Sequence, residues 1–141
     1  MSDFTLHPRL AADTLEAGDT PLCALRLVDD RRFFWAMLIP RRPDTVESFD
    51  LPAQESAGLW AEAEALGRFL KRECRADKIN IGALGNQVAQ LHVHVIARHR
   101  NDEAWPGPVW GAGQARALEA SEREERLTRL SAFIRTLTAD T

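Results

Sequence analysis

Polar and apolar side chains alternate along residues 90–95, in the first part of an expected strand at 90–98, and this pattern restricts the fold more than any other segment does. Successive side chains of a β-strand point to opposite faces, with neighbours on one face about 7 Å apart. The apolar residues would then face a hydrophobic core, and the polar ones would share an exposed face. Those polar residues are Gln90, His92 and His94. We therefore expect a strand that presents two imidazoles and an amide on one open surface.

The rest of the hydrophobic pattern predicts strands and helices that are segregated along the chain rather than alternating. Strands are expected at Cys23–Val28, 33–39, 78–84 and 90–98, the first two joined as a hairpin. Helices are expected within residues 7–20, from a cap at Asp50 to about residue 75, and at about 121–137. Segregated elements of this kind indicate an α+β fold with an antiparallel sheet.

Apolar residues at steps of three and four place one hydrophobic stripe on each of the two longer helices. In the first helix the stripe comprises Ala53, Ala57, Trp60, Ala63, Leu66 and Leu70. In the C-terminal helix it comprises Leu127, Leu130, Ile134 and Leu137. Each of these helices is thus expected to have one apolar face.

Length and charge exclude several classes of protein. The 141 residues suffice for a single domain, expected over 1–141, with a substantial core. A formal charge of −3 argues against broad nucleic-acid binding, which needs a basic face. No apolar run approaches the roughly 18–20 residues of a membrane span, and the first residues do not resemble a secretory signal, so we expect a cytoplasmic protein. Cys23 and Cys74 are expected to be buried thiols.

Two histidines on one strand face allow three readings: catalysis, metal binding or chance. A neutral imidazole can attack or relay protons at pH 7, and a second one can donate to a phosphate oxygen or a leaving group. Metal binding needs a third ligand, and none lies at a familiar spacing from His92 and His94. Catalysis is therefore favoured over a metal site on the residues alone.

The strip from Asn80 to Arg98, with its Gly-polar-polar-apolar turn at 85–88, resembles the signature of the histidine triad (HIT) family. Residues 27–29 and 35–43 resemble that family's nucleotide-side hairpin. The likeness covers roughly residues 22–100 and leaves 101–141 as a Trp/Pro loop followed by a helix. It implies a HIT-like fold: an antiparallel sheet of about five strands, a long helix packed on it, and a C-terminal helix.

The resemblance also implies roles for individual residues. His92 matches the histidine that becomes covalently nucleotidylated, and His94 matches the one that contacts phosphate and the departing group. Gln87 matches a residue near phosphate, Asn80 an amide contact to phosphate, and Asp29 a residue that holds the ribose.

Other candidate contacts come from the residues themselves. Backbone N–H groups of the 85–88 turn, Asn86 and Val88 included, are suited to hold an anion. Arg98 either meets phosphate or ends its strand in solvent.

Two positions depart from the family pattern. Gln90 replaces the first histidine of the triad, and Trp35 stands where many members have a fourth histidine on the hairpin. The Gln90 carbonyl can still orient an N–H of His92, whereas its side chain can donate and accept but not titrate. The Gln-x-His-x-His form, with the tryptophan-rich segment downstream, resembles a bacterial branch called diadenosine tetraphosphate hydrolase-like. The loop from Trp105 to Trp110 is either a lid that stacks a base or a rigid cover for the core.

The resemblance implies a hydrolase or nucleotidyl transferase that acts at the α-phosphate of a dinucleoside polyphosphate or nucleoside phosphoramidate through a covalent nucleotidyl-histidine. No metal or cofactor is required by this scheme, although Mg²⁺ can arrive with the substrate. A homodimer with sheets joined across subunits is implied as well. One alternative is a nucleotide-binding sensor or partner module with little turnover. Another is a metal-dependent hydrolase that uses His92 and His94.

Overall fold

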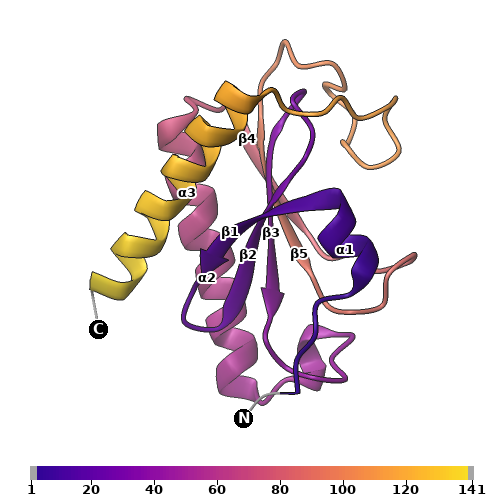
Figure 1. Cartoon of the computed structure of the whole chain (residues 1–141), viewed down its shortest axis with the longest axis vertical. Helices are drawn as coiled ribbons and strands as arrows, with labels where there is room; N and C mark the ends of the chain where they lie inside the picture. The colour runs from indigo at the N-terminus through magenta and orange to yellow at the C-terminus, as the bar shows by residue number, and fades with distance from the viewer. Residues whose placement is uncertain (1–2, 140–141) are drawn as a thin grey trace.

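The computed structural model describes residues 3–139 and contains a five-stranded antiparallel sheet. The elements in chain order are α1 (Pro8–Asp13), β1 (Thr14–Asp19), β2 (Cys23–Val28), β3 (Phe34–Pro40), the 3₁₀ turn η1 (Ser48–Asp50), α2 (Ala53–Glu73), β4 (Lys78–Gly82), β5 (Val93–Arg98) and α3 (Ala120–Ala139). The strand order is β1-β2-β3-β5-β4, so β5 lies between β3 and β4 (Figure 1). The predicted α+β fold is confirmed.

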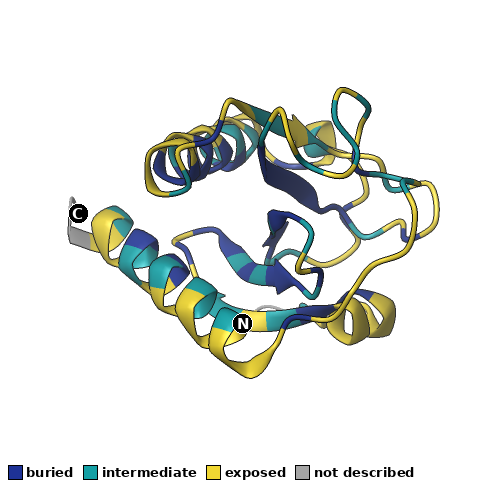
Figure 2. Cartoon of the chain, turned by 90° about the horizontal axis from the view of Figure 1, so that it is seen from above, coloured by how far each residue is buried: buried dark blue, intermediate teal, exposed yellow. Residues whose placement is uncertain are grey.

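The sheet has a different cover on each face. Helices α2 and α3 lie on one side, and α1 lies on the other with the loops (Figures 1 and 2). Inward residues of β2, β3 and β5 join both long helices in the main hydrophobic cluster, which includes Leu25, Leu38, Val95, Leu66 and Phe133. Residues that alternate with these strand positions point to the opposite face, where the candidate site lies.

The long helix buries a face that differs from the predicted stripe in its first half. Ala63, Leu66 and Leu70 are buried as expected, whereas Ala53 and Ala57 are exposed. Further along the same buried face lies Glu62, whose carboxylate accepts hydrogen bonds from Thr20 Oγ1 and Leu22 N at 2.5 and 3.0 Å. The helix begins at Ala53 with Pro52 as N-cap, and Asp50 instead accepts from the N–H groups that precede η1. The prediction that Asp50 caps α2 is therefore wrong.

The N-terminal segment holds the fifth strand. The predicted helix within residues 7–20 ends at Asp13, and β1 follows and pairs antiparallel with β2. Gly18, at φ +120°, sits where the β1 register shifts, a backbone conformation that favours glycine. Helix propensity gives way here because the segment gains backbone hydrogen bonds with β2 on both sides of this shift.

The strands that carry the site are shorter than predicted. Strand β4 ends at Gly82 and β5 begins only at Val93, so Gln90 and His92 precede the strand. The C-terminal helix agrees with the prediction, because Leu130 is buried and Leu127, Ile134 and Leu137 pack around it. Cys23 is a buried free thiol as predicted, and Cys74 is a half-buried one. No helix within residues 3–139 is long and apolar enough to cross a membrane.

Candidate functional site

A cavity of about 350 Å³ lies over the sheet face opposite α2. His92 and His94 form part of its wall, together with residues 85–88 of the turn and both Trp35 and Trp110. A second cavity of about 420 Å³ adjoins it and extends toward the β2–β3 turn. The two cavities share Asp13, Trp35, Met37 and Gly111.

The imidazoles are less exposed than the alternation pattern predicts. His92 is 7% exposed and His94 is 5% exposed, so the predicted open surface is wrong. Aromatic rings enclose His94: the ring centroids of His92, Trp110 and Trp35 lie 5.0, 5.3 and 5.7 Å from its own. The pair is therefore held at the floor of a cavity, where water is restricted and electrostatic interactions are stronger than in bulk solvent.

His92 has a defined tautomer. Its Nδ1 lies 2.7 Å from the backbone carbonyl of Gln90. A carbonyl oxygen only accepts, so a neutral ring must donate from Nδ1 and leave a lone pair on Nε2. Within residues 3–139, Nε2 has no hydrogen-bond partner and is not among the buried unpaired atoms, which places it at the cavity. The expected orienting contact from the Gln90 carbonyl is thus present.

His94 has the opposite tautomer. Trp35 Nε1 donates to His94 Nδ1 at 2.9 Å, so a neutral His94 carries its proton on Nε2. Burial, reinforced by the neighbouring His92, lowers the pKa of His94 to about 3. The site therefore combines one ring with a lone pair at Nε2 and one neutral ring with a proton at Nε2, a donor–acceptor pair suited to attack and to oxyanion contact.

The side chain of Gln90 does not join the two histidines, contrary to the prediction. Its Nε2 donates to the Thr5 carbonyl at 2.9 Å, and its Oε1 accepts from His7 N at 2.8 Å. Gln90 lies before β5, so the strand alternation that placed it beside the rings does not extend to it. The residue anchors the N-terminal segment and contributes only its carbonyl to the site.

Arg98 and Asn80 lie apart from the cavity in a saturated polar cluster. Arg98 is 2% exposed and pairs with Asp102 through Nε and Nη2 at 2.8 and 3.0 Å. It also donates to Asn80 Oδ1 and to the Gly107 carbonyl, each at 2.8 Å. Burial alone would raise the pKa of Asp102, but Arg98 and neighbouring backbone N–H groups outweigh burial and lower this pKa to about 2. The structure therefore brings neither Arg98 nor Asn80 to the candidate phosphate position, and Arg98 does not end its strand in solvent.

The turn and Asp29 lie where the sequence places them, next to the cavities. Asn86, Gln87 and Val88 line the first cavity, and Gly85 takes the positive φ of +73° that the turn requires. The Val88 side chain is buried in an apolar cluster, so it can offer a ligand only its backbone. Asp29 lines the second cavity, and its Oδ1 accepts from Leu118 N at 2.8 Å. Within residues 3–139 its other carboxylate oxygen has no hydrogen-bond partner.

Sequence reasoning missed the contribution of α1 to the site. Arg9 and Asp13 line the first cavity, and their side chains lie 3.9 Å apart as an exposed pair. Asp13 also borders the second cavity. The polar residues one turn apart on a short helix were visible, but nothing in the sequence indicated that this helix folds over the sheet.

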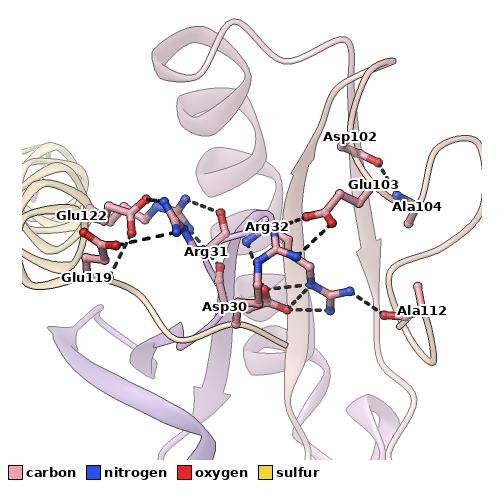
Figure 3. Close-up of polar contacts among 11 residues, drawn as sticks. Asp30, Arg31, Arg32, Asp102, Glu103, Ala104, Ala112, Glu119 and Glu122 are labelled. Carbon is pink, nitrogen blue, oxygen red and sulfur yellow. Dashed lines mark hydrogen bonds and ion pairs between the residues drawn. The ribbon is translucent and has the colours of Figure 1, made fainter. Parts of the chain in front are cut away.

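The segment after β5 lines the second cavity through Val109 and residues 111–113. Charged residues hold this segment in place (Figure 3). Arg32 pairs with the buried Asp30 at 2.8 Å and donates to the Ala112 carbonyl at 2.7 Å. Burial alone would raise the pKa of Asp30, yet its hydrogen bonds with Arg32 lower it. Glu103 pairs with Arg116 across the same segment. The contact from Arg32 to Ala112 holds the segment against the β2–β3 turn, and the Glu103–Arg116 pair braces the segment itself.

The loop from Trp105 to Trp110 is expected from the sequence to be either a lid beside the site or a cover for the core, and its two tryptophans differ in this respect. Trp110 lines the first cavity beside His94, and its Nε1 is the single buried side-chain nitrogen or oxygen without a partner among residues 3–139. Trp105 instead lies under the Arg98 guanidinium, 5.7 Å from its centre. Trp110 therefore walls the site, and Trp105 covers the polar cluster of Arg98.

No group of three or more His, Cys, Asp or Glu side chains among residues 3–139 is arranged to hold a metal ion. His99, the remaining histidine near the strand, directs Nε2 to the Cys74 carbonyl at 3.0 Å, away from the cavity.

Comparisons with known proteins agree with the fold. The HIT domain model matches residues 11–101, a range that contains the predicted 22–100. A histidine triad protein from Bradyrhizobium japonicum is 45% identical, with a TM-score of 0.90 over 93% of this chain and 98% of its own. One from Sinorhizobium meliloti is 45% identical, with a TM-score of 0.89 over 92% and 96%. One from Marinobacter aquaeolei is 37% identical, with a TM-score of 0.92 over 95% and 98%.

No curated protein sequence matches the chain. The family model nevertheless covers well over half of it, and the solved relatives align along nearly its whole length. The chain belongs to the histidine triad (HIT) domain family.

Proposed function

We propose that the protein is a nucleotide hydrolase or nucleotidyl transferase that acts at the α-phosphate of a nucleotide derivative. The observation that carries the proposal is the 2.7 Å contact between His92 Nδ1 and the Gln90 carbonyl. This contact keeps the proton on Nδ1 and leaves the Nε2 lone pair at the cavity, which is the state a nucleophilic imidazole needs. When Nε2 becomes phosphorylated, the ring turns cationic, and the same carbonyl accepts a stronger, charge-assisted hydrogen bond.

The reaction proceeds in two displacements at one phosphorus atom. First, His92 Nε2 bonds to the α-phosphorus, and the bond to the leaving group breaks with its electron pair on the leaving group. Second, a water oxygen bonds to the same phosphorus, the N–P bond breaks, and its electron pair returns to Nε2. The water gives up one proton to solvent, and a nucleoside monophosphate is released. An alcohol in place of water would make the second step a transfer.

The walls of the cavities supply contacts for the rest of the substrate. Backbone N–H groups at Asn86, Gln87 and Val88 form a concave donor site for phosphate oxygens, and His94 Nε2–H is a further donor. The second cavity has the volume for a nucleoside, with the free oxygen of Asp29 as acceptor for ribose hydroxyl groups. The leaving group would lie along Trp110. No metal takes part in these steps, and Mg²⁺ enters only with the substrate's phosphates.

The branch and the assembly are part of the proposal. The Gln-x-His-x-His form supports the diadenosine tetraphosphate hydrolase-like branch. A homodimer is supported by the outer edge of β4, which has no neighbouring strand within the sheet. Ile81 on that strand is 39% exposed, and Leu84 just beyond it is 45% exposed. Pairing of this edge with a second copy would cover apolar residues and satisfy backbone groups.

A second candidate is a nucleotide-binding sensor or partner module with little turnover. It is favoured by Gln90 and Trp35, which replace two family histidines by side chains that do not titrate near neutral pH. A metal-dependent hydrolase that uses His92 and His94 is the third candidate, and treatment with a chelator would abolish its activity.

The deciding experiment is to trap the covalent adduct. The protein is mixed with diadenosine tetraphosphate or with an adenosine phosphoramidate, quenched, and analysed by peptide mass spectrometry. We expect a nucleotidyl group on His92 and a loss of turnover of at least a thousandfold in His92→Ala. His99→Asn is the matched control, because His99 lies outside the cavity. Tight nucleotide binding without adduct or His92-dependent release would establish the sensor instead.

A further inference from the structure

Trp35 determines which ring nitrogen of His94 can carry a proton. Its indole Nε1–H lies 2.9 Å from His94 Nδ1, and an indole has no acceptor. The hydrogen bond therefore requires a lone pair on Nδ1. Protonation of His94 would add a proton to Nδ1, directly opposite the indole N–H. The hydrogen bond would then be lost, and two N–H donors would face each other in a buried site. A histidine at position 35, by contrast, would adapt to either state of its neighbour.

Among residues 3–139, the hydrogen-bond partner of the His94 ring is Trp35, and no carboxylate is paired with the ring. The neighbouring ring from the same segment is His92, and its cationic form would repel a second cation at His94. Helix α1 contributes Arg9 and Asp13 to the cavity wall, and these two already lie next to each other. The turn at 85–88 has no titratable side chain, and neither Trp35 nor Trp110 titrates near neutral pH. The low pKa of His94 follows from burial and His92, in agreement with this geometry.

From this arrangement we propose that Trp35 is a positioning residue that holds His94 as a neutral Nε2–H donor, and that the site thereby selects substrates with an anionic phosphate leaving group. This inference rests on the proposed function and names its substrate class. The favoured bond is the P–O–P anhydride of a dinucleoside or nucleoside polyphosphate. The disfavoured bond is the P–N bond of a phosphoramidate.

The selection follows from the proton balance of the first step. When His92 Nε2 attacks an anhydride, the P–O bond breaks and the electron pair stays on a phosphate oxygen, which is a stable anion at neutral pH. A hydrogen bond from His94 Nε2–H suffices to stabilise it, and no proton needs to be transferred. When the P–N bond of a phosphoramidate breaks, the electron pair falls on nitrogen, which must gain a proton to leave. A neutral imidazole would become an anion if it gave up Nε2–H, so it is a poor acid for this step.

The first test measures the tautomer directly and does not depend on turnover. Two-dimensional ¹H–¹⁵N NMR of the histidine rings distinguishes Nδ1–H, Nε2–H and doubly protonated states. We expect His94 to remain in the Nε2–H state from neutral pH down to about pH 5, and Trp35→Phe to release it into a mixture that titrates at higher pH. Trp110→Phe is the matched control, since Trp110 contacts the same ring but its Nε1 bonds to no described residue. A His94 that carries a proton on Nδ1 at neutral pH in the native protein overturns the inference.

The second test compares leaving groups. For the native protein we expect kcat/KM for diadenosine tetraphosphate to exceed that for an adenosine phosphoramidate, and we expect no titration of His94 in the pH profile down to about pH 5. In Trp35→Phe and Trp35→His the ratio should shift toward the phosphoramidate by about tenfold at mildly acidic pH, and the titration of His94 should enter the profile. An unchanged ratio and profile in both folded variants would overturn the leaving-group selection. If neither substrate turns over while NMR shows the Trp35-dependent tautomer, the proposed function fails and the positioning role stands.

Discussion

The polar face of β5 has buried polar residues at both ends, but those at one end line a cavity and the one at the other end is fully engaged with the protein. Near the start of the strand, His92 and His94 each have one ring nitrogen bound to the protein and the other at a cavity. At the last position of the strand, Arg98 is bound to Asp102, Asn80 and the Gly107 carbonyl. All three residues are buried. The difference teaches that burial does not separate a reactive polar residue from a structural one, whereas an open hydrogen-bonding position beside a cavity does.

The largest effect on stability is expected at the Arg98 end. Arg98→Met would leave the buried carboxylate of Asp102 without its cation, and the loss of one partner from a buried pair costs about 3 to 5 kcal/mol. Activity per folded molecule should change less than about threefold, because Arg98 does not line either cavity over the rings. Urea denaturation measures the free energy of unfolding, and turnover is measured on the folded fraction.

His92→Ala is the matched variant at the other end of the face. Its ring is tied to the protein through a single backbone carbonyl, so we expect a stability loss of roughly 1 kcal/mol alongside the loss of chemistry. If Arg98→Met removed activity and left the urea midpoint unchanged, the assignment of the two ends would have to be exchanged.

The sequence could not separate these two ends, for a physical reason. Alternation along Val93–Arg98 correctly predicts which side chains point away from the main core, because the pleat of β5 fixes the face of each residue, whereas it does not place Gln90. It does not predict what covers that face. The partners of Arg98 come from Asp102 on a loop and Asn80 on another strand, and Trp35 reaches His94 diagonally from β3. Such contacts depend on tertiary packing rather than on a local period.

The resemblance to the family was most informative where the contacts are made by main-chain groups. The turn at 85–88 borders the cavity as expected, since its shape depends on Gly85 and its donors are main-chain groups. It was least informative at positions where the side chain departs from the family. Gln90 aligns with a histidine, yet it lies outside the strand and turns toward residues 5–7.

An intermediate effect on the free energy of unfolding is expected from His94 as the pH falls. A histidine in an unfolded chain has a pKa of about 6.5, and the pKa of folded His94 is about 3. Between these values the unfolded state binds a proton that the folded state does not. The stability contribution is therefore complete above about pH 6.5 and decreases as the pH falls, by roughly 2 kcal/mol at pH 5.

The part of the stability loss at acidic pH that is due to His94 can be isolated with the variant His94→Asn. The variant lacks the ring, so its unfolding free energy should fall less steeply than that of the native protein between about pH 6.5 and pH 5. Asp102 and Asp30, whose folded pKa values are lowered, lose their contributions only at lower pH and act equally on both proteins. Parallel stability curves over this interval would mean that His94 titrates normally in the folded state.

The smallest effect is expected at Gln90, and it tests whether the first triad position matters through its side chain or its backbone. Gln90→Ala removes two hydrogen bonds to the N-terminal segment and should cost about 1 kcal/mol, with faster hydrogen exchange near Thr5 and His7. The carbonyl that holds His92 Nδ1 is unchanged, so rapid-quench measurement of nucleotidyl-histidine formation should give the native rate within about threefold. Gln90→His should behave alike, because a side chain at this position points toward the N-terminal segment. A gain of tenfold or more in Gln90→His would instead mean that the side chain reaches the reacting groups, and that the replaced histidine limits the native rate.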